Sequence, residues 1–397
     1  MASQYDEFRP PERLLLGAGP ANVHPRVLHA MTASLLGHLD PNFLGAMDDV
    51  RAMLREVFQT ENAATLPVPG TGTAGMEAAM VNILEPGDTM IVATNGYFGE
   101  RLADIASRTG STVVTVDHAV GQPVHAASVA TELAKHKSVK AVGVVHAETS
   151  TGVVTPLHEI SKVVHDAGAL FVVDAVTSLG GVEMCVVDWD IVVCYSGTQK
   201  CLGAPPGLAP ITFGERAVKV MTDRKTQVQS FYLDMTMLSS YWEQRVYHHT
   251  APISMIYSIR EALRIVLEEG LEARWRRHTL SATALIAGLD AMGLGVVANK
   301  AHRVPSLTAI FSPEGIPEAA VRKYLLEEQG IEVSGGLASM ATLAGKIWRV
   351  GLMGHNSTIP NVLRFLSALE TAIAKQGYEV PAGVGLAAAQ KVVRDSA

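Results

Sequence analysis

One lysine follows a run of residues that could prepare it for covalent chemistry. An apolar run ends at Tyr195, the small polar residues 196–199 come next, and Lys200 stands before a Gly/Pro-rich turn at 201–207. Burial lowers the pKa of a lysine, and the neutral amine can then form an imine with an aldehyde cofactor while its polar neighbours bind a phosphate. A solvated loop lysine is the alternative, and by spacing alone it is the commoner case.

A carboxylate provides the second chemical group. Asp174 directly follows the apolar run 171–173 and precedes the lysine segment in the chain. At the carboxyl end of a strand, this side chain could keep a pyridinium nitrogen protonated and so make the ring of a cofactor an electron sink. An isolated Asp after a strand is more often a turn or helix-cap residue. Its pairing with Lys200 favours the cofactor interpretation.

A third segment, Pro69 to Ala79, is a Gly/Thr turn that leads into an Ala-rich helix. The first turn of a helix presents free N–H groups and a positive dipole end, and both favour phosphate. Such turns are common, so this pattern alone is weak evidence. Because no Gly-Lys-Ser/Thr follows, the segment does not predict a nucleotide-binding Walker loop.

The elements that must position these groups alternate between Met76 and Phe213. Short β-branched runs are followed by longer amphipathic stretches, which is typical of βαβ units around a mostly parallel, buried sheet. The strand-like runs are 89–93, 112–116, 141–145, 170–173 and 191–194. In such sheets ligands bind at the carboxyl ends of the strands, where Asp174 and the lysine segment lie.

The second half of the chain has a different pattern. Long helices are expected at 252–270 and 271–294, followed by shorter strands at 306–311, 331–334 and 348–352 and helices at 316–328 and 359–375. We therefore expect an N-terminal arm over 1–19, a large domain over 20–272 and a smaller α+β domain over 273–397.

Composition excludes several classes of protein. The 397 residues carry a net charge of -7, with 48% hydrophobic and 18% charged residues, so neither a disordered chain nor a nucleic-acid partner is expected. No apolar stretch suits a signal peptide or a bilayer span, so we expect a cytoplasmic protein without a membrane partner. Cys185, Cys194 and Cys201 are expected to be reduced thiols, and no spacing predicts a metal site.

Six ordered segments together resemble the class V, fold-type-I aminotransferases that depend on pyridoxal 5'-phosphate (PLP), and most closely the alanine–glyoxylate / serine–pyruvate group. The resemblance covers about residues 14–376, and its specific segments are 17–22, 146–152, 173–175, 196–200, 247–250 and 345–351. It implies an α/β fold in which a large domain contains a mostly parallel seven-stranded sheet flanked by helices. A smaller C-terminal α+β domain follows.

The resemblance also assigns roles to matching residues. Lys200 would carry PLP as a Schiff base and move a proton between the substrate Cα and C4′ of the cofactor, while Asp174 would pair with the pyridinium nitrogen. Arg349 and Gly19 would contact the substrate, with Arg349 on its α-carboxylate. Further cofactor contacts would come from Thr71, Gly72, Thr73, Phe98, Thr149, Val176 and Gln199. Tyr247 and Thr250 would reach the phosphate from a neighbouring subunit, which implies a homodimer with shared active sites.

Plain structural alternatives exist for several of these residues. Phe98 could be ordinary core, Tyr247 a residue that flanks a helix, and Arg349 part of an exposed strand face. His248 and His249 read as a surface or core pair rather than metal ligands. Two departures from the family, Phe98 in place of Trp and Thr73 in place of His, leave the ring stacking and the phosphate contacts open.

The expected reaction is transfer of an amino group from a small L-amino acid, alanine or serine, to glyoxylate or pyruvate by a ping-pong mechanism, with alanine and glyoxylate as the favoured pair. Pyridoxamine–pyruvate enzymes are disfavoured, since they place a glutamate at Thr71 and an arginine at Ser339.

The alternative is an (S)-ureidoglycine–glyoxylate aminotransferase. Those enzymes carry an asparagine at Tyr247 and a glutamine at His38, so this chain lacks the amides that would pair with a ureido group. More distant alternatives are a PLP lyase of the cysteine desulfurase type, which needs a mobile loop cysteine, and a binding protein that keeps the fold without turnover.

Overall fold

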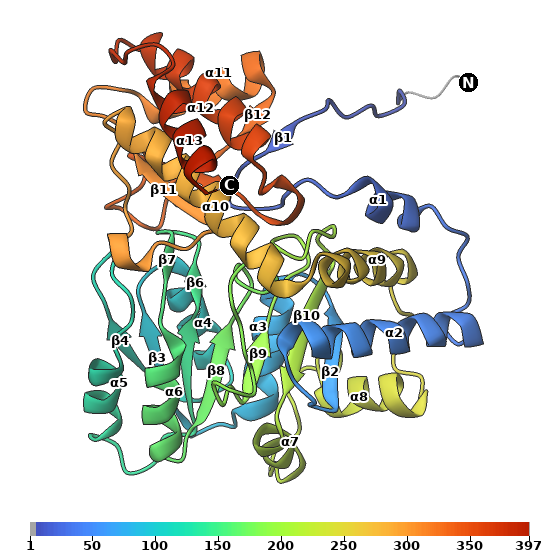
Figure 1. Cartoon of the computed structure of the whole chain (residues 1–397). Coiled ribbons are helices and arrows are strands. Elements are labelled where there is room, and N and C mark those ends of the chain that lie inside the picture. The colour runs from blue at the N-terminus through green and yellow to red at the C-terminus, as the bar shows by residue number, and fades with distance from the viewer. Residues whose placement is uncertain (1–4, 397) are drawn as a thin grey trace.

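The computed structural model describes residues 5–396 and contains a larger and a smaller body, joined by a long helix (Figure 1). The larger body is built on a seven-stranded sheet with the order β2-β10-β9-β8-β5-β3-β4. Its strands are β2 (Ala64–Pro69), β3 (Thr89–Thr94), β4 (Thr112–Asp117), β5 (Ala141–Val145), β8 (Leu170–Asp174), β9 (Val193–Tyr195) and β10 (Leu208–Phe213).

Most of this sheet is parallel, as the sequence predicts. Strands β4, β3, β5, β8 and β9 pair in parallel, and β10 alone runs antiparallel to both of its neighbours, β2 and β9. Every residue of β5, β8, β9 and β10 is buried, which explains their continuous apolar runs. The predicted α/β fold class is confirmed.

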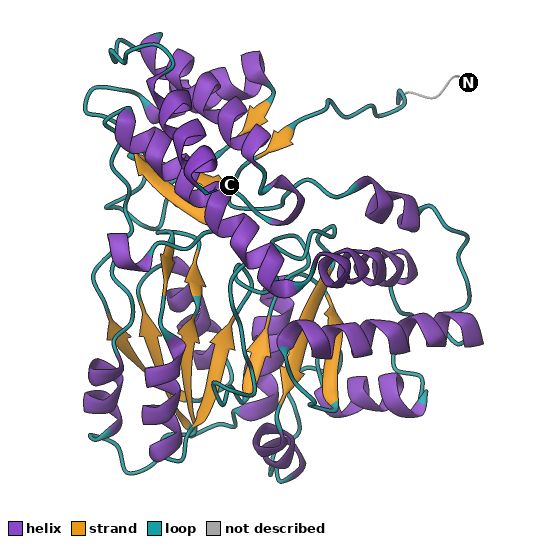
Figure 2. Ribbon diagram, in the orientation of Figure 1, coloured by secondary structure: helices purple, strands orange, loops and turns teal. Residues whose placement is uncertain are grey.

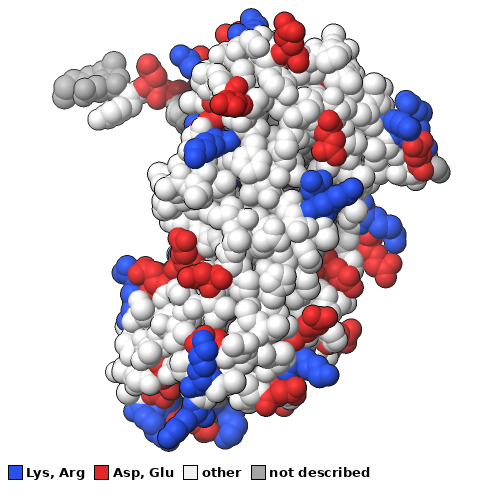
Figure 3. Space-filling model, turned by 90° about the vertical axis from the view of Figure 1, so that its left-hand side faces the viewer, with Lys and Arg blue, Asp and Glu red and all other residues white. Residues whose placement is uncertain are grey.

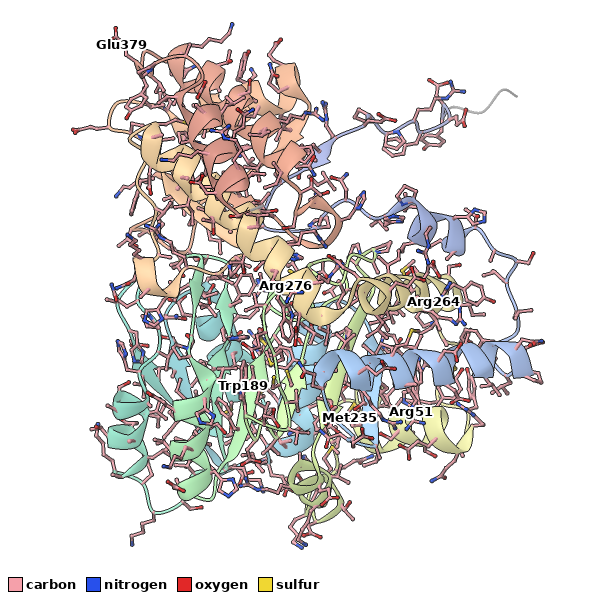
Figure 4. All side chains as sticks on the ribbon, viewed as in Figure 1. Arg51, Trp189, Met235, Arg264, Arg276 and Glu379 are labelled. Carbon is pink, nitrogen blue, oxygen red and sulfur yellow. The ribbon has the colours of Figure 1, made fainter. Side chains whose placement is uncertain are left out.

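Helices flank the sheet and cover its apolar faces (Figure 2). They are α2 (Pro41–Phe58), α3 (Gly72–Ile83), α4 (Tyr97–Ser107), α5 (Ala126–Leu133), α6 (Leu157–Asp166), α7 (Glu215–Thr222), α8 (Met235–Gln244) and α9 (Ile253–Glu269). Helix α2 shows how local sequence sets the ends: the Asp40 carboxylate accepts from the Asn42 N–H at 2.8 Å, and Pro41 occupies the first turn. Arg51 of α2, labelled in Figure 4, donates to Glu243 at the end of α8 at 2.9 Å and ties the two helices together.

The smaller body packs helices on a three-stranded sheet with the order β11-β14-β13. Its elements are α10 (Leu271–Ala291), β11 (Leu307–Phe311), α11 (Glu318–Gln329), β12 (Ile331–Glu332), β13 (Ser334–Gly335), β14 (Ile347–Gly351), α12 (Ile359–Ala374) and α13 (Val384–Asp395). Its separate apolar core includes Trp348 and Phe365 together with Leu16 from the N-terminal segment. Short elements complete the fold: β1 (Leu14–Leu15), α1 (Pro25–Met31), β6 (Ala147–Glu148), β7 (Val153–Val154) and the 3-10 turns 300–302 and 354–356.

Two details differ from the expectations. The single strand expected at 331–334 is two short strands in different sheets, because β12 pairs with β1 while β13 pairs with β14. Helix α13, which was not predicted, packs along α10. The proposed domain boundary at residue 272 lies just after Gly270, where a φ of 81° separates α9 from α10. Residues 1–4 of the proposed arm lie outside the described residues.

Within residues 5–396, no helix is long and apolar enough to cross a membrane. Acidic and basic side chains are interspersed on the face of the molecule drawn in Figure 3. All three cysteines are buried free thiols.

Candidate active site

A cavity of about 270 Å³ lies at the carboxyl edge of the large sheet, where the sequence predicts the chemistry. Most of the predicted cofactor residues line it: Thr71, Gly72, Thr73, Phe98, Thr149, Asp174, Val176, Gln199 and Lys200. They meet there because β8 and β9 are parallel neighbours and end at the same edge, while α3 and α4 begin beside it.

Lys200 is buried, with 8% of its surface exposed, so it is not a solvated loop lysine. Its Nζ donates to the carbonyl oxygen of Ala18. Burial, assisted by the positive charge of Arg349, lowers the pKa of Lys200 to about 8. Gly19 lies so close that a Cβ added there would stand 2.6 Å from Nζ, and its φ of 102° also favours glycine.

Asp174 ends β8 and is buried. Its Oδ1 accepts from the Val176 N–H at 2.8 Å, and burial raises the pKa of the carboxyl to about 7. No lysine, arginine or histidine nitrogen lies within 4.0 Å of it in the part of the chain that the structure describes. Tyr195, the register partner of Asp174 on β9, has a buried hydroxyl without a hydrogen bond of normal geometry, and burial together with Asp174 raises its pKa well above the usual value.

The part of the cavity wall at the start of α3 is suited to an anion. Helix α3 begins there at Gly72, and its N-cap residue Thr71 makes no side-chain hydrogen bond to the helix. The first N–H groups of a helix need outside partners. Beside them lies the amide of Gln199, whose buried oxygen has no hydrogen-bond partner among the described residues and whose NH2 group is a donor that suits an anion.

These observations test whether PLP suits the site. A buried carboxylate without a cationic neighbour matches a protonated ring nitrogen, and a helix N-terminus matches a phosphate. A buried lysine whose pKa is lowered to about 8 lines the same cavity and matches an aldehyde. The residues present therefore fit the cofactor.

Phe98 is half-buried and lines the cavity, so it is not ordinary core. Its position depends on Glu148, a fully buried carboxylate that accepts from the Phe98 N–H at 3.1 Å and from the Ser150 N–H at 2.9 Å. Burial raises the pKa of Glu148, and these hydrogen bonds oppose that shift. Glu148 stands within a segment quoted from the sequence, but no role was predicted for it.

Arg349 comes from β14 of the smaller body and is 7% exposed, so the exposed strand face suggested as an alternative is wrong. Its Nε donates to the Gly335 carbonyl at 2.8 Å and its Nη1 to the Thr149 carbonyl at 3.2 Å. These contacts hold the guanidinium against the larger body beside the cavity.

Tyr247 and Thr250 do not line this cavity. They lie in the loop between α8 and α9, where Tyr247 is 58% exposed and its ring centre is 5.3 Å from that of His38. Their contribution to a neighbouring subunit therefore stays a prediction. In the same loop the His248 and His249 rings meet at 2.8 Å between their Nδ1 atoms, and residues 5–396 contain no cluster that could hold a metal.

Sequence reasoning missed Arg101 and Met76, which also line the cavity. Arg101 follows Phe98 by three positions on α4, and residues at that spacing share one face of a helix. That spacing is the signal that could have identified it.

Comparisons with known proteins agree with this geometry. The family model for aminotransferase class V matches residues 13–365, so the chain belongs to the class V aminotransferases. It is an enzyme of the transferase class that depends on pyridoxal phosphate.

Three relatives illustrate the likeness. The structure of ureidoglycine–glyoxylate aminotransferase from Bacillus subtilis has a TM-score of 0.95 at 40% identity, over 98% of this chain and 100% of that chain. The structure of an alanine–glyoxylate aminotransferase from Nostoc sp. has a TM-score of 0.91 at 45% identity, over 94% and 98%. The alanine–glyoxylate aminotransferase of Mus musculus is 40% identical over 91% of this chain and 88% of its own.

Proposed function

We propose that this aminotransferase moves the amino group of a small L-amino acid, alanine or serine, to glyoxylate or pyruvate, with alanine and glyoxylate as the favoured pair. The observation that carries the proposal is the placement of Lys200 and Asp174 in one cavity, with Arg349 beside it. The names of the similar proteins support glyoxylate as the acceptor.

In this proposal PLP, when bound, supplies an aldehyde that takes up amino groups and a ring that delocalises the electrons left by a departing proton. Lys200 attaches the cofactor, and its freed neutral amine then carries the proton between the substrate Cα and C4′. Asp174 keeps the ring nitrogen protonated. Arg349 binds the α-carboxylate and orients the Cα–H bond.

The remaining cofactor contacts are those that the family resemblance implies, and the lining of the cavity supports them. Phe98 and Val176 would contact the ring, Thr149 would lie near the phenolic oxygen, and Gln199 with the start of α3 would bind the phosphate. We further propose a homodimer in which Tyr247 and Thr250 of one subunit complete the phosphate site of the other, and a cytoplasmic location.

The choice of amino donor rests on two residues. His38 and Tyr247 are in ring contact, where ureidoglycine enzymes have glutamine and asparagine. An imidazole and a phenol offer a ureido group fewer complementary partners than two amides do. The likeness to the Bacillus subtilis enzyme nevertheless keeps (S)-ureidoglycine as the second candidate donor.

A lyase of the cysteine desulfurase type is disfavoured. That chemistry needs a mobile thiol, and Cys185, Cys194 and Cys201 are all buried. None of the three lines the cavity, and burial raises the pKa of each thiol.

The test is a set of half-reactions followed by absorbance. Purified holoenzyme is mixed with L-alanine, L-serine or (S)-ureidoglycine without a keto acid, and the visible cofactor band is recorded. We expect alanine to bleach the band and glyoxylate to restore it. If alanine and serine leave the band unchanged while ureidoglycine bleaches it, the proposed donor is wrong.

The variant H38Q/Y247N tests the structural reason for this preference. We expect it to gain rate with ureidoglycine relative to alanine, because it restores two amides. An unchanged ratio of the two rates would remove these residues from the explanation.

A further inference from the structure

Arg101, on the first turns of α4, places a guanidinium in the wall of the cofactor cavity. Its Nη1 donates to the Thr73 hydroxyl at 3.1 Å and its Nη2 to the Tyr97 hydroxyl at 3.3 Å. The guanidinium carbon lies 4.8 Å from the ring centre of Phe98 and 4.9 Å from that of Tyr97. Two aromatic rings and two hydroxyls therefore fix its orientation.

Among the described residues, this guanidinium has no anionic partner. Within residues 5–396, no carboxylate oxygen lies within 4.0 Å of it, and its two hydrogen bonds go to neutral hydroxyls. Arg349 also lacks a carboxylate partner, but two backbone carbonyls hold it, whereas Arg108 on the same stretch pairs with Asp104 at 3.0 Å. A guanidinium in a cavity wall without a counter-charge is a ready anion-binding group.

The position of Arg101 indicates which anion it meets. Thr73 is in the first turn of α3, so the hydrogen bond brings the cation beside the helix N-terminus that suits a phosphate. The Thr73 oxygen accepts from Arg101, which leaves the hydroxyl hydrogen free to donate to a phosphate oxygen.

We propose that Arg101, acting with Thr73, binds the phosphate of the cofactor. This inference rests on the proposed cofactor site and adds a charged residue to a cradle that otherwise consists of neutral donors. In this proposal Thr73 orients the guanidinium through its hydrogen bond. Phe98 contacts both the cofactor ring and the Arg101 guanidinium.

The experiment compares the binding of PLP with that of pyridoxal, which lacks the phosphate. Dissociation constants are measured by absorbance titration of apoenzyme for the natural protein, R101Q, R101K and R108Q. We expect R101Q to lose about ten- to a hundredfold of the preference for PLP over pyridoxal, which is the range for a hydrogen-bonded charge, with R101K in between. R108Q, which alters an exposed arginine, should keep the full preference.

Each other outcome has a defined meaning. If R101Q weakens PLP and pyridoxal equally, Arg101 only braces Phe98 and Thr73, and the proposal is wrong. If R101Q keeps the ratio but raises KM for alanine or glyoxylate, the guanidinium serves a substrate carboxylate instead. If the natural apoenzyme binds neither compound, the proposed cofactor site itself fails, independently of Arg101.

Inorganic phosphate provides a second readout that involves no cofactor. We expect phosphate to raise the thermal midpoint of the natural apoenzyme and of R108Q, but not that of R101Q. An equal rise in all three would contradict the proposal. Circular dichroism before each titration shows whether R101Q is folded.

Discussion

At the scale of single residues, burial moves the pKa values of Asp174 and Lys200 toward each other. That of Asp174 rises to about 7 and that of Lys200 falls to about 8, each because the charged form is poorly solvated. PLP would relieve both groups, since attachment would replace the free ammonium group of Lys200 and a protonated ring nitrogen would pair with Asp174. The apoenzyme is thus arranged to accept this cofactor.

The pKa of Lys200 predicts how reconstitution depends on pH. Only the neutral amine attacks an aldehyde, so the rate of PLP attachment to apoenzyme should rise with pH and level off above about 8. Stopped-flow absorbance across pH 6 to 10 at about constant ionic strength measures this rate. A rate that keeps rising toward 10.5, the ordinary lysine value, would show that Lys200 is not desolvated.

We expect the substitution Asp174→Asn to have opposite effects on the thermal stability of the apoenzyme and of the holoenzyme. The pKa of Asp174 is raised from 3.8 to about 7 in the folded state, which therefore holds the proton more tightly. The resulting stability is fully present below pH 3.8 and is lost as pH rises from there through about 7. Asp174→Asn removes a buried ionisable group, so the apoenzyme should unfold at a higher temperature than the natural apoenzyme at pH 8, with a smaller difference at pH 5.

With PLP bound the order should reverse, because the amide cannot pair with a cationic ring nitrogen. Thermal unfolding with and without cofactor measures both effects. An Asp174→Asn variant that keeps full PLP affinity would contradict the role assigned to this carboxylate.

The ends of a few elements determine the site at the scale of secondary structure. Asp174 and Tyr195 are adjacent because β8 and β9 are parallel and in register. The β-branched runs in the sequence predicted both strands and a mostly parallel sheet, but not which strands pair or their register. The split of β12 from β13 was not predictable, because two-residue strands leave no periodic pattern and depend on distant partners. The same applies to the packing of α13 on α10, which needs the tertiary fold.

The start of α4 provides a prediction at this scale. A Cβ at Gly96 would stand 2.5 Å from both the Glu148 Cγ and the Ser150 Oγ, so Gly96→Ala must displace the buried carboxylate or the helix that carries Phe98. We expect a loss of about 1–3 kcal/mol in the free energy of unfolding and weaker PLP binding.

Gly45→Ala is the matched control for this substitution. Gly45 is within the exposed part of α2 and has no atom within 4 Å of an added Cβ, so alanine should be neutral or stabilising by up to about 1 kcal/mol. Chemical denaturation measures both variants. Equal stabilities would show that the start of α4 is free to move.

The active site contains residues from both bodies and from the N-terminal segment. Arg349 of the smaller body donates to the Thr149 carbonyl of the larger one, and Lys200 donates to Ala18 of the N-terminal segment. Arg349, Thr149 and Lys200 were assigned because each stands in a recognisable segment, whereas no role was predicted for Ala18. The sequence did not predict Arg101 or Glu148, since their importance depends on which groups face them across the cavity.

We expect a subunit interface at the loop that carries Tyr247, together with Phe231, which packs against this loop. Phe231 is 65% exposed and stacks on His248 at 5.1 Å between ring centres, which leaves an aromatic surface for a second subunit. Phe231→Glu should shift the protein toward monomers and weaken PLP binding with it. Val187→Glu, at a position 60% exposed before the amino end of β9, should leave the dimer intact.

Light scattering after size exclusion measures the mass, and a PLP titration follows on the same samples. If the natural protein is a monomer that binds PLP with full affinity, the shared active site is wrong. A dimer that survives Phe231→Glu would place the interface elsewhere.

The most direct test of the central claim is to locate the cofactor on the chain. Holoenzyme is reduced with borohydride, which makes the link between PLP and an amine permanent, and the digested protein is analysed by peptide mass spectrometry. We predict that the added mass lies on Lys200 alone and disappears after prior incubation with L-alanine, which displaces the lysine. A label on a different lysine, or no label in protein saturated with PLP, would contradict the account.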